Sequence, residues 1–185
     1  MEEKVKELKR LIGELQAQDR YDLLLDAIGE NTLERLQIEM ARKDLSPLRV
    51  TYDYLFVLVK TNKTVELSPI QKALYLLFLQ HEEGIEFKML GDYRDELRGI
   101  YAKVTNRVNI GKMEDTIARI TDPLDNAINE NCSRIKAAFA AVLDKYSLRY
   151  YIIAGHTVKH IESSSRVWFE RRKTIMLPRE LVEIG

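Results

Sequence analysis

The sequence contains little cysteine, no long apolar run and no excess of charge. Its one cysteine among 185 residues, Cys132, excludes an intramolecular disulfide and a metal site built from several cysteines. The longest apolar run, near residues 73–79, is far too short to span a bilayer, and the first residues carry no apolar signal-peptide region. These absences predict a cytoplasmic protein with no membrane partner.

Charge is balanced over the whole chain but not along it. Basic and acidic side chains number 29 each, so the formal net charge is zero and no overall field points to nucleic acid or membrane. Residues 1–44 carry 8 basic and 11 acidic side chains, a net charge of −3, whereas residues 145–185 carry 8 and 4, a net charge of +4. The basic end of the chain is therefore its C-terminal quarter.

The spacing of apolar residues predicts helices throughout the first 46 residues. A helix over residues 2–18 has an apolar row close to a two-heptad seam, formed by Val5, Leu8, Leu11, Ile12 and Leu15. Shorter helices are expected over 21–29 and from about residue 31. The first helix either packs on its own domain or forms a homodimer with a second copy, and both alternatives stay open. We assign residues 1–46 to a helical N-terminal segment and residues 47–185 to a second domain.

A change of pattern after Pro47 predicts strands and then a buried helix. Residues 49–60 carry apolar side chains on both faces, as in a strand covered on both sides, and residues 64–67 form a short returning strand. Ser68 with Gln71 then forms a capping box, and the intervening proline suits the first helical turn. The following residues are apolar nearly all round until Gly84, where the helix is expected to end, so this helix is central and buried.

Further helices and a terminal hairpin are expected downstream. Residues 90–104 and 113–120 have helical spacing, with a loop over 105–112 between them. The longest helix is predicted over residues 123–146, and its apolar stripe consists of Leu124, Ile128, Cys132, Ile135, Phe139, Val142 and Tyr146. Its opposite face is polar or small and consists of Asn126, Asn129, Glu130, Ser133, Ala137 and Ala140. Because residues 148–154 and 173–177 are expected to pair as strands, the fold class is α+β.

No group of residues in the sequence indicates a reaction. His156 and His160 are four apart, but a glycine and a strand precede them, and threonine stands where a metalloprotease helix needs glutamate. Cys132 lies on an apolar stripe, where a thiol is normally inert. No glycine-rich phosphate loop and no Gly-x-Ser-x-Gly elbow occurs. We therefore expect no enzyme, no metal and no cofactor, with an enzyme of dispersed active site as the weakest alternative.

The basic hairpin region is the stronger candidate for a binding site. Its cations surround Trp168 and Phe169, and they are Arg166, Arg171, Arg172 and Lys173. Basic side chains interleaved with aromatic ones on a projecting hairpin suit phosphate contact and base stacking. A solvated hairpin whose tryptophan packs back on the core is an equally favoured alternative.

Three short motifs carry a resemblance to a known class of DNA-binding domain. Leu67-Ser68-Pro69 opens a helix, residues 81–85 (His-Glu-Glu-Gly-Ile) end it, and residues 132–139 (Cys-Ser-Arg-Ile-Lys-Ala-Ala-Phe) resemble a recognition helix. With the order of elements expected over residues 64–177, they resemble the winged helix-turn-helix of the OmpR/PhoB-type effector domain of bacterial response regulators. The chain as a whole also resembles an uncharacterised bacterial protein family with the same helix–helix–wing arrangement, which implies no activity.

This resemblance implies a winged-helix-like domain, with a small antiparallel sheet and a C-terminal β-hairpin wing, that binds double-stranded DNA. The long helix would enter the major groove, and its base-reading residues would be Asn126, Asn129, Ser133 and Arg134. The hairpin would touch phosphates through Arg166, Arg171, Arg172 and Lys173. We expect a non-enzymatic, transcription-regulator-like protein. The nearly balanced charge of the long helix favours the alternative, a winged-helix-like module that binds a protein partner.

Overall fold

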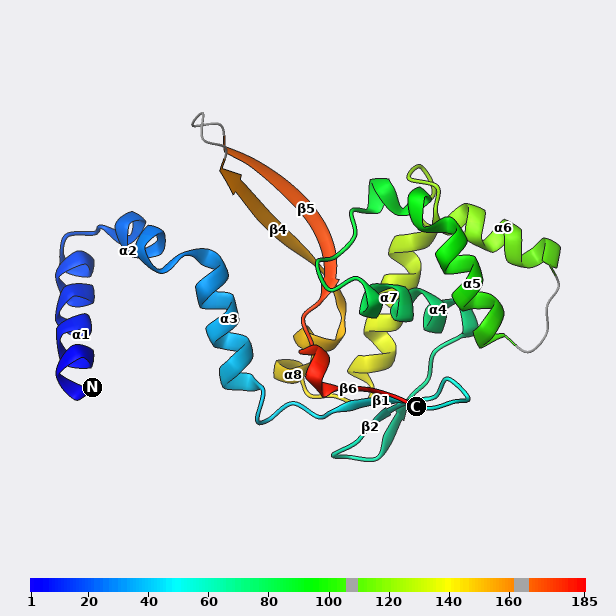
Figure 1. Cartoon of the computed structure of the whole chain (residues 1–185), viewed down its shortest axis with the longest axis horizontal. Helices are drawn as coiled ribbons and strands as arrows, with labels where there is room; N and C mark the ends of the chain where they lie inside the picture. Colours follow the sequence, from blue (N-terminus) through cyan, green and yellow to red (C-terminus); the bar gives the residue numbers. More distant parts are fainter. Residues whose placement is uncertain (106–109, 162–166) are drawn as a thin grey trace. The chain divides into compact units, whose positions relative to one another are not determined.

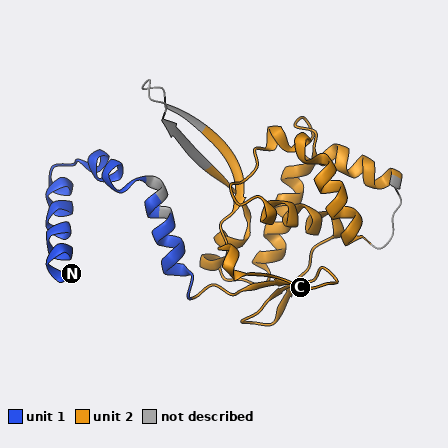
Figure 2. Cartoon of the chain, in the orientation of Figure 1, with its two compact units in different colours: residues 1–43 blue, residues 44–185 orange. Residues whose placement is uncertain are grey.

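The computed structural model describes residues 1–105, 110–161 and 167–185, and it confirms the α+β class. The chain divides into two compact units, residues 1–43 and residues 44–185 (Figure 2). The sequence had placed a boundary three residues later, after residue 46. Each unit is described by itself.

The first unit consists of three helices, and none of their described side chains is buried. They are α1 (Glu2–Ala17), α2 (Tyr21–Ile28) and α3 (Glu30–Ala41), and they confirm the predicted helical N-terminus (Figure 1). All side chains of α1 and α2 are described and none of them is buried. Val5, Leu8 and Leu11 are 45%, 57% and 44% exposed. The apolar row of α1 is therefore open within its own unit.

A small mixed sheet opens the second unit. Its strand order is β3 (Lys63–Val65), β2 (Phe56–Leu58), β1 (Leu48–Val50) and β6 (Val182–Ile184). The first three strands pair antiparallel, but β6 returns from the far end of the chain and pairs parallel with β1. The predicted small antiparallel sheet is therefore wrong in one respect, because β6 pairs parallel with its neighbour.

The single strand predicted over residues 49–60 is wrong, because the chain reverses between β1 and β2. The Thr51 hydroxyl accepts a hydrogen bond from the Leu55 N–H at 3.1 Å, and the Tyr54 N–H donates to the Thr51 carbonyl at 2.8 Å. Tyr54 adopts φ +54°, a left-handed conformation that bulky residues rarely take. The apolar alternation thus conceals a tight turn.

Helix α4 (Pro69–Gln80) is the centre of the core, as predicted. The capping box is present, with the Ser68 N–H donating to Gln71 Oε1 at 2.9 Å, and eight of the twelve residues are buried. The Tyr75 hydroxyl donates to the Tyr151 carbonyl at 2.7 Å, and the Tyr151 hydroxyl donates to the Ser46 carbonyl at 2.6 Å. These two hydrogen bonds link α4 to Tyr151, and Tyr151 in turn to the segment just before β1.

The helix ends four residues before Gly84, where the sequence had placed its end. Gly84 has φ +82° and closes the turn that follows. A Cβ atom at this position would lie 2.7 Å from the Lys173 carbonyl oxygen, so only glycine lets the chain run this close to β5 (Val167–Ile175). The next residue, Ile85, then forms an antiparallel bridge with Lys173.

Five further helices complete the described helical part before the hairpin, and of these α5 and α7 pack directly on α4. They are the 3₁₀ helix η1 (Phe87–Tyr93) and the α-helices α5 (Arg94–Val104), α6 (Ile110–Ile120), α7 (Ala127–Ala140) and α8 (Lys145–Tyr151). The predicted helices at 90–104 and 113–120 are confirmed, with Leu97, Ile100 and Ile117 buried. Of the loop predicted over 105–112, residues 110–112 belong to α6, and residues 106–109 lie outside the described residues.

The helix predicted over residues 123–146 is too long at both ends. Asp122 and Asp125 accept hydrogen bonds from the backbone N–H two residues ahead, at 2.9 and 2.8 Å, and such turns compete with a helix. Asp144 caps the separate helix α8 in the same way, at 2.8 and 2.9 Å. Leu124 and Tyr146, which had been placed on the apolar stripe, are consequently 94% and 85% exposed.

The chain closes with a long hairpin that projects from the helices (Figure 1). Strand β4 (Ile153–Ile161) pairs antiparallel with β5, and the short helix η2 (Arg179–Leu181) then leads into β6. The hairpin itself was predicted, but the strand expected over 148–154 is wrong, because α8 occupies residues 148–151. The segment between the two predicted strands is mostly paired strand as well, since β4 extends to Ile161 and β5 begins at Val167.

Candidate nucleic-acid interface

Helix α7 presents one polar face to solvent. Its inner side chains anchor it against the core, and they are Ala127, Ile128, Asn131, Ile135 and Phe139. The four residues predicted to read bases are all exposed, and they are Asn126, Asn129, Ser133 and Arg134. The structure therefore brings these four together on one surface.

The groups on this face are oriented by contacts within it. The Asn129 Nδ2 donates to Asn126 Oδ1 at 3.1 Å, which fixes one amide against the other. The Arg134 guanidinium lies 3.7 Å from the Glu130 carboxylate and stays 65% exposed. Amides and a guanidinium are the side chains that form paired hydrogen bonds with purine edges in the major groove. Because Glu130 offsets the charge of Arg134, the attraction of this face for phosphate is small.

The cations of the hairpin differ in their surroundings. Arg171 is exposed, whereas Arg172 Nε donates to Glu170 Oε1 at 2.6 Å. The Lys173 ammonium lies 5.3 Å from the centre of the Phe87 ring, within reach of a cation–π contact. Arg166 lies outside the described residues, as do the side chains of the neighbouring aromatic residues on whose packing the alternative prediction depends.

The base of the hairpin lies against α7, which carries the polar face, and against the central helix α4. Strand β4 contacts α7, and β5 contacts α4. Burial raises the pKa of the Cys132 thiol on α7 to about 12, and the nearby charge of Lys173 opposes this rise. A thiol with such a pKa stays protonated at neutral pH, which agrees with a packing role for Cys132.

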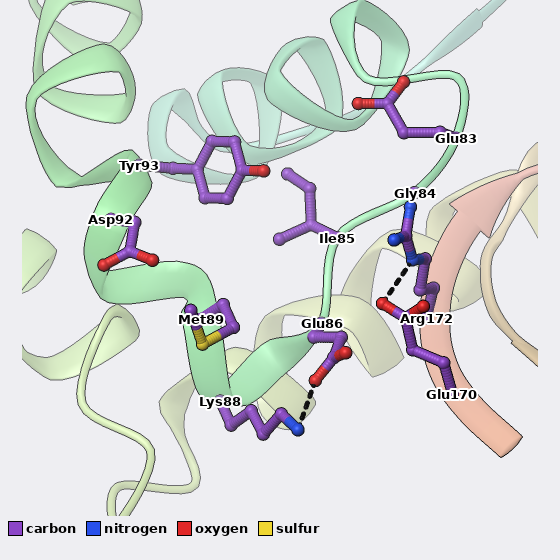
Figure 3. A pocket seen from close by; sticks show the side chains of 10 residues that line it. All are labelled: Glu83, Gly84, Ile85, Glu86, Lys88, Met89, Asp92, Tyr93, Glu170 and Arg172. Carbon is purple, nitrogen blue, oxygen red and sulfur yellow. Dashed lines mark hydrogen bonds and ion pairs between the residues drawn. The ribbon is translucent and has the colours of Figure 1, made fainter. Parts of the chain in front are cut away.

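An open pocket lies against the face of β5 that carries Glu170 and Arg172, beside the chain that leads into η1 (Figure 3). It has a volume of about 450 Å³, and its charged lining residues are Glu83, Glu86, Asp92, Glu170, Lys88 and Arg172. The Lys88 ammonium lies 2.7 Å from the Glu86 carboxylate. This pocket was not predicted from the sequence. The spacing of Glu170 and Arg172 on one strand was the available signal, because residues two apart share a strand face.

The two histidines noted in the sequence lie on strand β4. His156 lies in β4 opposite Arg172, while the side chain of His160 is outside the described part of the chain. Among the described residues, no three histidine, cysteine, aspartate or glutamate side chains are grouped so that they could hold a metal ion. In the same residues, no helix combines the length and the apolar character needed to cross a membrane.

Comparison of this chain with protein-family models, with curated proteins and with solved structures finds no match.

Proposed function

We propose that residues 44–185 form a winged-helix-like module that binds double-stranded DNA and has no enzymatic activity. The observation that carries this proposal is the outer face of α7, where four side chains suited to base edges are exposed together. In this proposal α7 enters the major groove and the β4–β5 hairpin contacts the phosphate backbone. A role in transcription regulation, in the cytoplasm, is part of the same proposal.

The order and pairing of elements support a winged-helix-like arrangement. Helix α4 is followed by the extended residue Ile85, then by η1, α5, α6, α7 and the short helix α8, and finally by the hairpin. The single antiparallel bridge between Ile85 and Lys173 joins the extended residue after α4 to β5. A hairpin whose base contacts a helix with a polar outer face is suited to touching two parts of a duplex at once.

The direct test is the salt dependence of binding to mixed-sequence duplex DNA. If the protein neutralises phosphates, its affinity falls steeply between about 50 and 200 mM salt. Arg134→Glu on α7 is expected to weaken binding about tenfold or more, since one base contact is worth about 1–3 kcal/mol. Lys63→Glu, the same change of charge at an exposed residue of β3, is the matched control. Equal losses in both variants, or no salt-dependent binding by the wild type, would count against the proposal.

A protein-interaction module is the second candidate. It is favoured by the nearly balanced charge of the α7 face and by the internal contacts of Arg172 and Lys173. The open apolar row of α1 supports an association of the first unit, and we propose a second copy of the chain as its partner. The row is flanked by four acidic and four basic side chains, so two copies would meet without net repulsion. Self-association without DNA binding would favour this candidate.

A further inference from the structure

We infer that, over residues 170–173 of the hairpin, DNA meets the face that carries Arg171, and that Arg172 is a positioning residue on the opposite face. This inference rests on the proposed DNA binding and names the side of the hairpin that performs it. The sequence had treated Arg171 and Arg172 as equivalent phosphate contacts. The strand register and the partners of each guanidinium separate them.

Alternation along β5 assigns each cation to a face. Ile175 and its cross-strand partner Ile153 are both buried, so their side of the hairpin is the core side at its base. Residues two apart share a face, which places Lys173 and then Arg171 on this side, successively further from the core. Arg172 and Glu170 lie on the other side. The charge of Lys173 acts on Cys132 of α7, which agrees with the place of Lys173 on the core side.

The face of the hairpin that carries Arg172 and Glu170 already holds an ion pair between them. Glu170, whose side chain is 11% exposed, accepts the 2.6 Å hydrogen bond from Arg172. Because Ile85 pairs antiparallel with Lys173, the next residue, Glu86, stands beside Arg172. The pKa of Arg172 is raised, first by its hydrogen bond to Glu170 and also by the charges of Glu86 and Glu83. A phosphate would have to displace these carboxylates from the guanidinium.

The same carboxylates would repel a DNA backbone. Four acidic side chains line the pocket on this side of β5, against the two cations Lys88 and Arg172, and both cations are paired with carboxylates there (Figure 3). On the core side, Lys173 lies against Phe87, and Arg171 is exposed one step further along the hairpin. Arg171 is therefore the cation of residues 171–173 that is placed to contact phosphate. Arg172 joins β5 to its neighbouring segment and so holds the hairpin in position.

The two adjacent arginines form a matched pair for the experiment. Arg171→Ala and Arg172→Ala, each in the full chain, are titrated with one mixed-sequence duplex at 50 and 200 mM salt, alongside the wild type. Each phosphate contact makes the slope of log affinity against log salt concentration steeper by about 0.9. When one contact is lost, the factor by which affinity falls between 50 and 200 mM salt becomes about 3.5-fold smaller. We expect this change for Arg171→Ala. For Arg172→Ala we expect less than a third of this change in the salt slope, together with a lower melting temperature.

A second variant keeps the test decisive if Arg172→Ala does not fold. Glu170→Gln combined with Arg172→Gln removes both charges of the pair, leaves the net charge unchanged and is expected to bind with the wild-type salt slope. A slope reduced by about 0.9 in this double variant, with Arg171→Ala unchanged, would overturn the inference while leaving the proposed DNA binding intact. Equal effects of both arginines would also overturn it. Absence of salt-dependent binding by the wild type would instead refute the proposed function.

Discussion

Replacing Tyr75 by phenylalanine tests how the core of the second unit is held together. The Tyr75 side chain is completely buried, packs edge-on against Phe56 at 5.5 Å between ring centres, and donates its hydroxyl proton to the Tyr151 carbonyl at 2.7 Å. Tyr75→Phe keeps the ring and removes only the hydroxyl. Because a buried acceptor then loses its donor, we expect the free energy of unfolding to fall by about 1–3 kcal/mol.

Urea denaturation of the full chain measures this loss, and Tyr52→Phe is its control. With a denaturant slope of about 2 kcal/mol per molar urea, the midpoint for Tyr75→Phe should fall by about 0.5–1.5 M. The Tyr52 ring is 87% exposed, so its hydroxyl is solvated and its removal should change the free energy by less than about 0.5 kcal/mol. Equal midpoints for the two variants would refute the argument that the hydroxyl of Tyr75 stabilises the fold.

Three further predictions concern pH, association and helix capping. Burial raises the pKa of Tyr151 from 10.0 to about 12, so the folded state favours the neutral phenol. Its contribution is complete below pH 10 and should be lost as the pH rises from 10 to 12, which denaturation at a series of pH values measures. Leu8→Glu on the apolar row of α1 should shift self-association to higher concentration in sedimentation experiments, whereas Lys9→Glu beside it should not. Asp144→Ala should lower the free energy of unfolding by about 1 kcal/mol, because it removes the cap of α8.

Signals confined to one element allowed the sequence to predict α4 and the hairpin. Ser68 and Gln71 mark the start of α4, and its continuous apolar body predicts burial without any knowledge of its neighbours. The end of the helix was missed because Gly84 serves a different purpose. It is required by the close approach of β5, a contact between residues far apart in the chain.

Errors in the other elements arose where side chains redirect the backbone. Thr51 and the left-handed Tyr54 reverse the chain within a run of apolar residues that otherwise reads as one strand. Asp122 and Asp144 divide the predicted long helix by bonding to the backbone. The parallel pairing of β6 with β1 joins Leu48 to Val182, and no periodicity in either segment predicts a partner so distant.

The candidate interface was predicted in part. Helical periodicity placed Asn126, Asn129, Ser133 and Arg134 on one face, and the structure has all four exposed. Strand alternation puts Arg171 and Arg172 on opposite faces of the hairpin, but the sequence does not show which segment lies against each face. Glu86 and Glu83, which lie near Arg172, come from another element, and only the folded chain brings them close.

The central claim, that the outer face of α7 and one face of the hairpin contact DNA, is tested most directly by backbone amide NMR of the full chain. Spectra are compared without and with a mixed-sequence duplex at low salt. We predict that the shifted signals concentrate at residues 126–134 and 170–173, while residues 48–65 of the sheet stay unchanged. Shifts confined to the sheet or to α1, or no shifts at all, would contradict the claim.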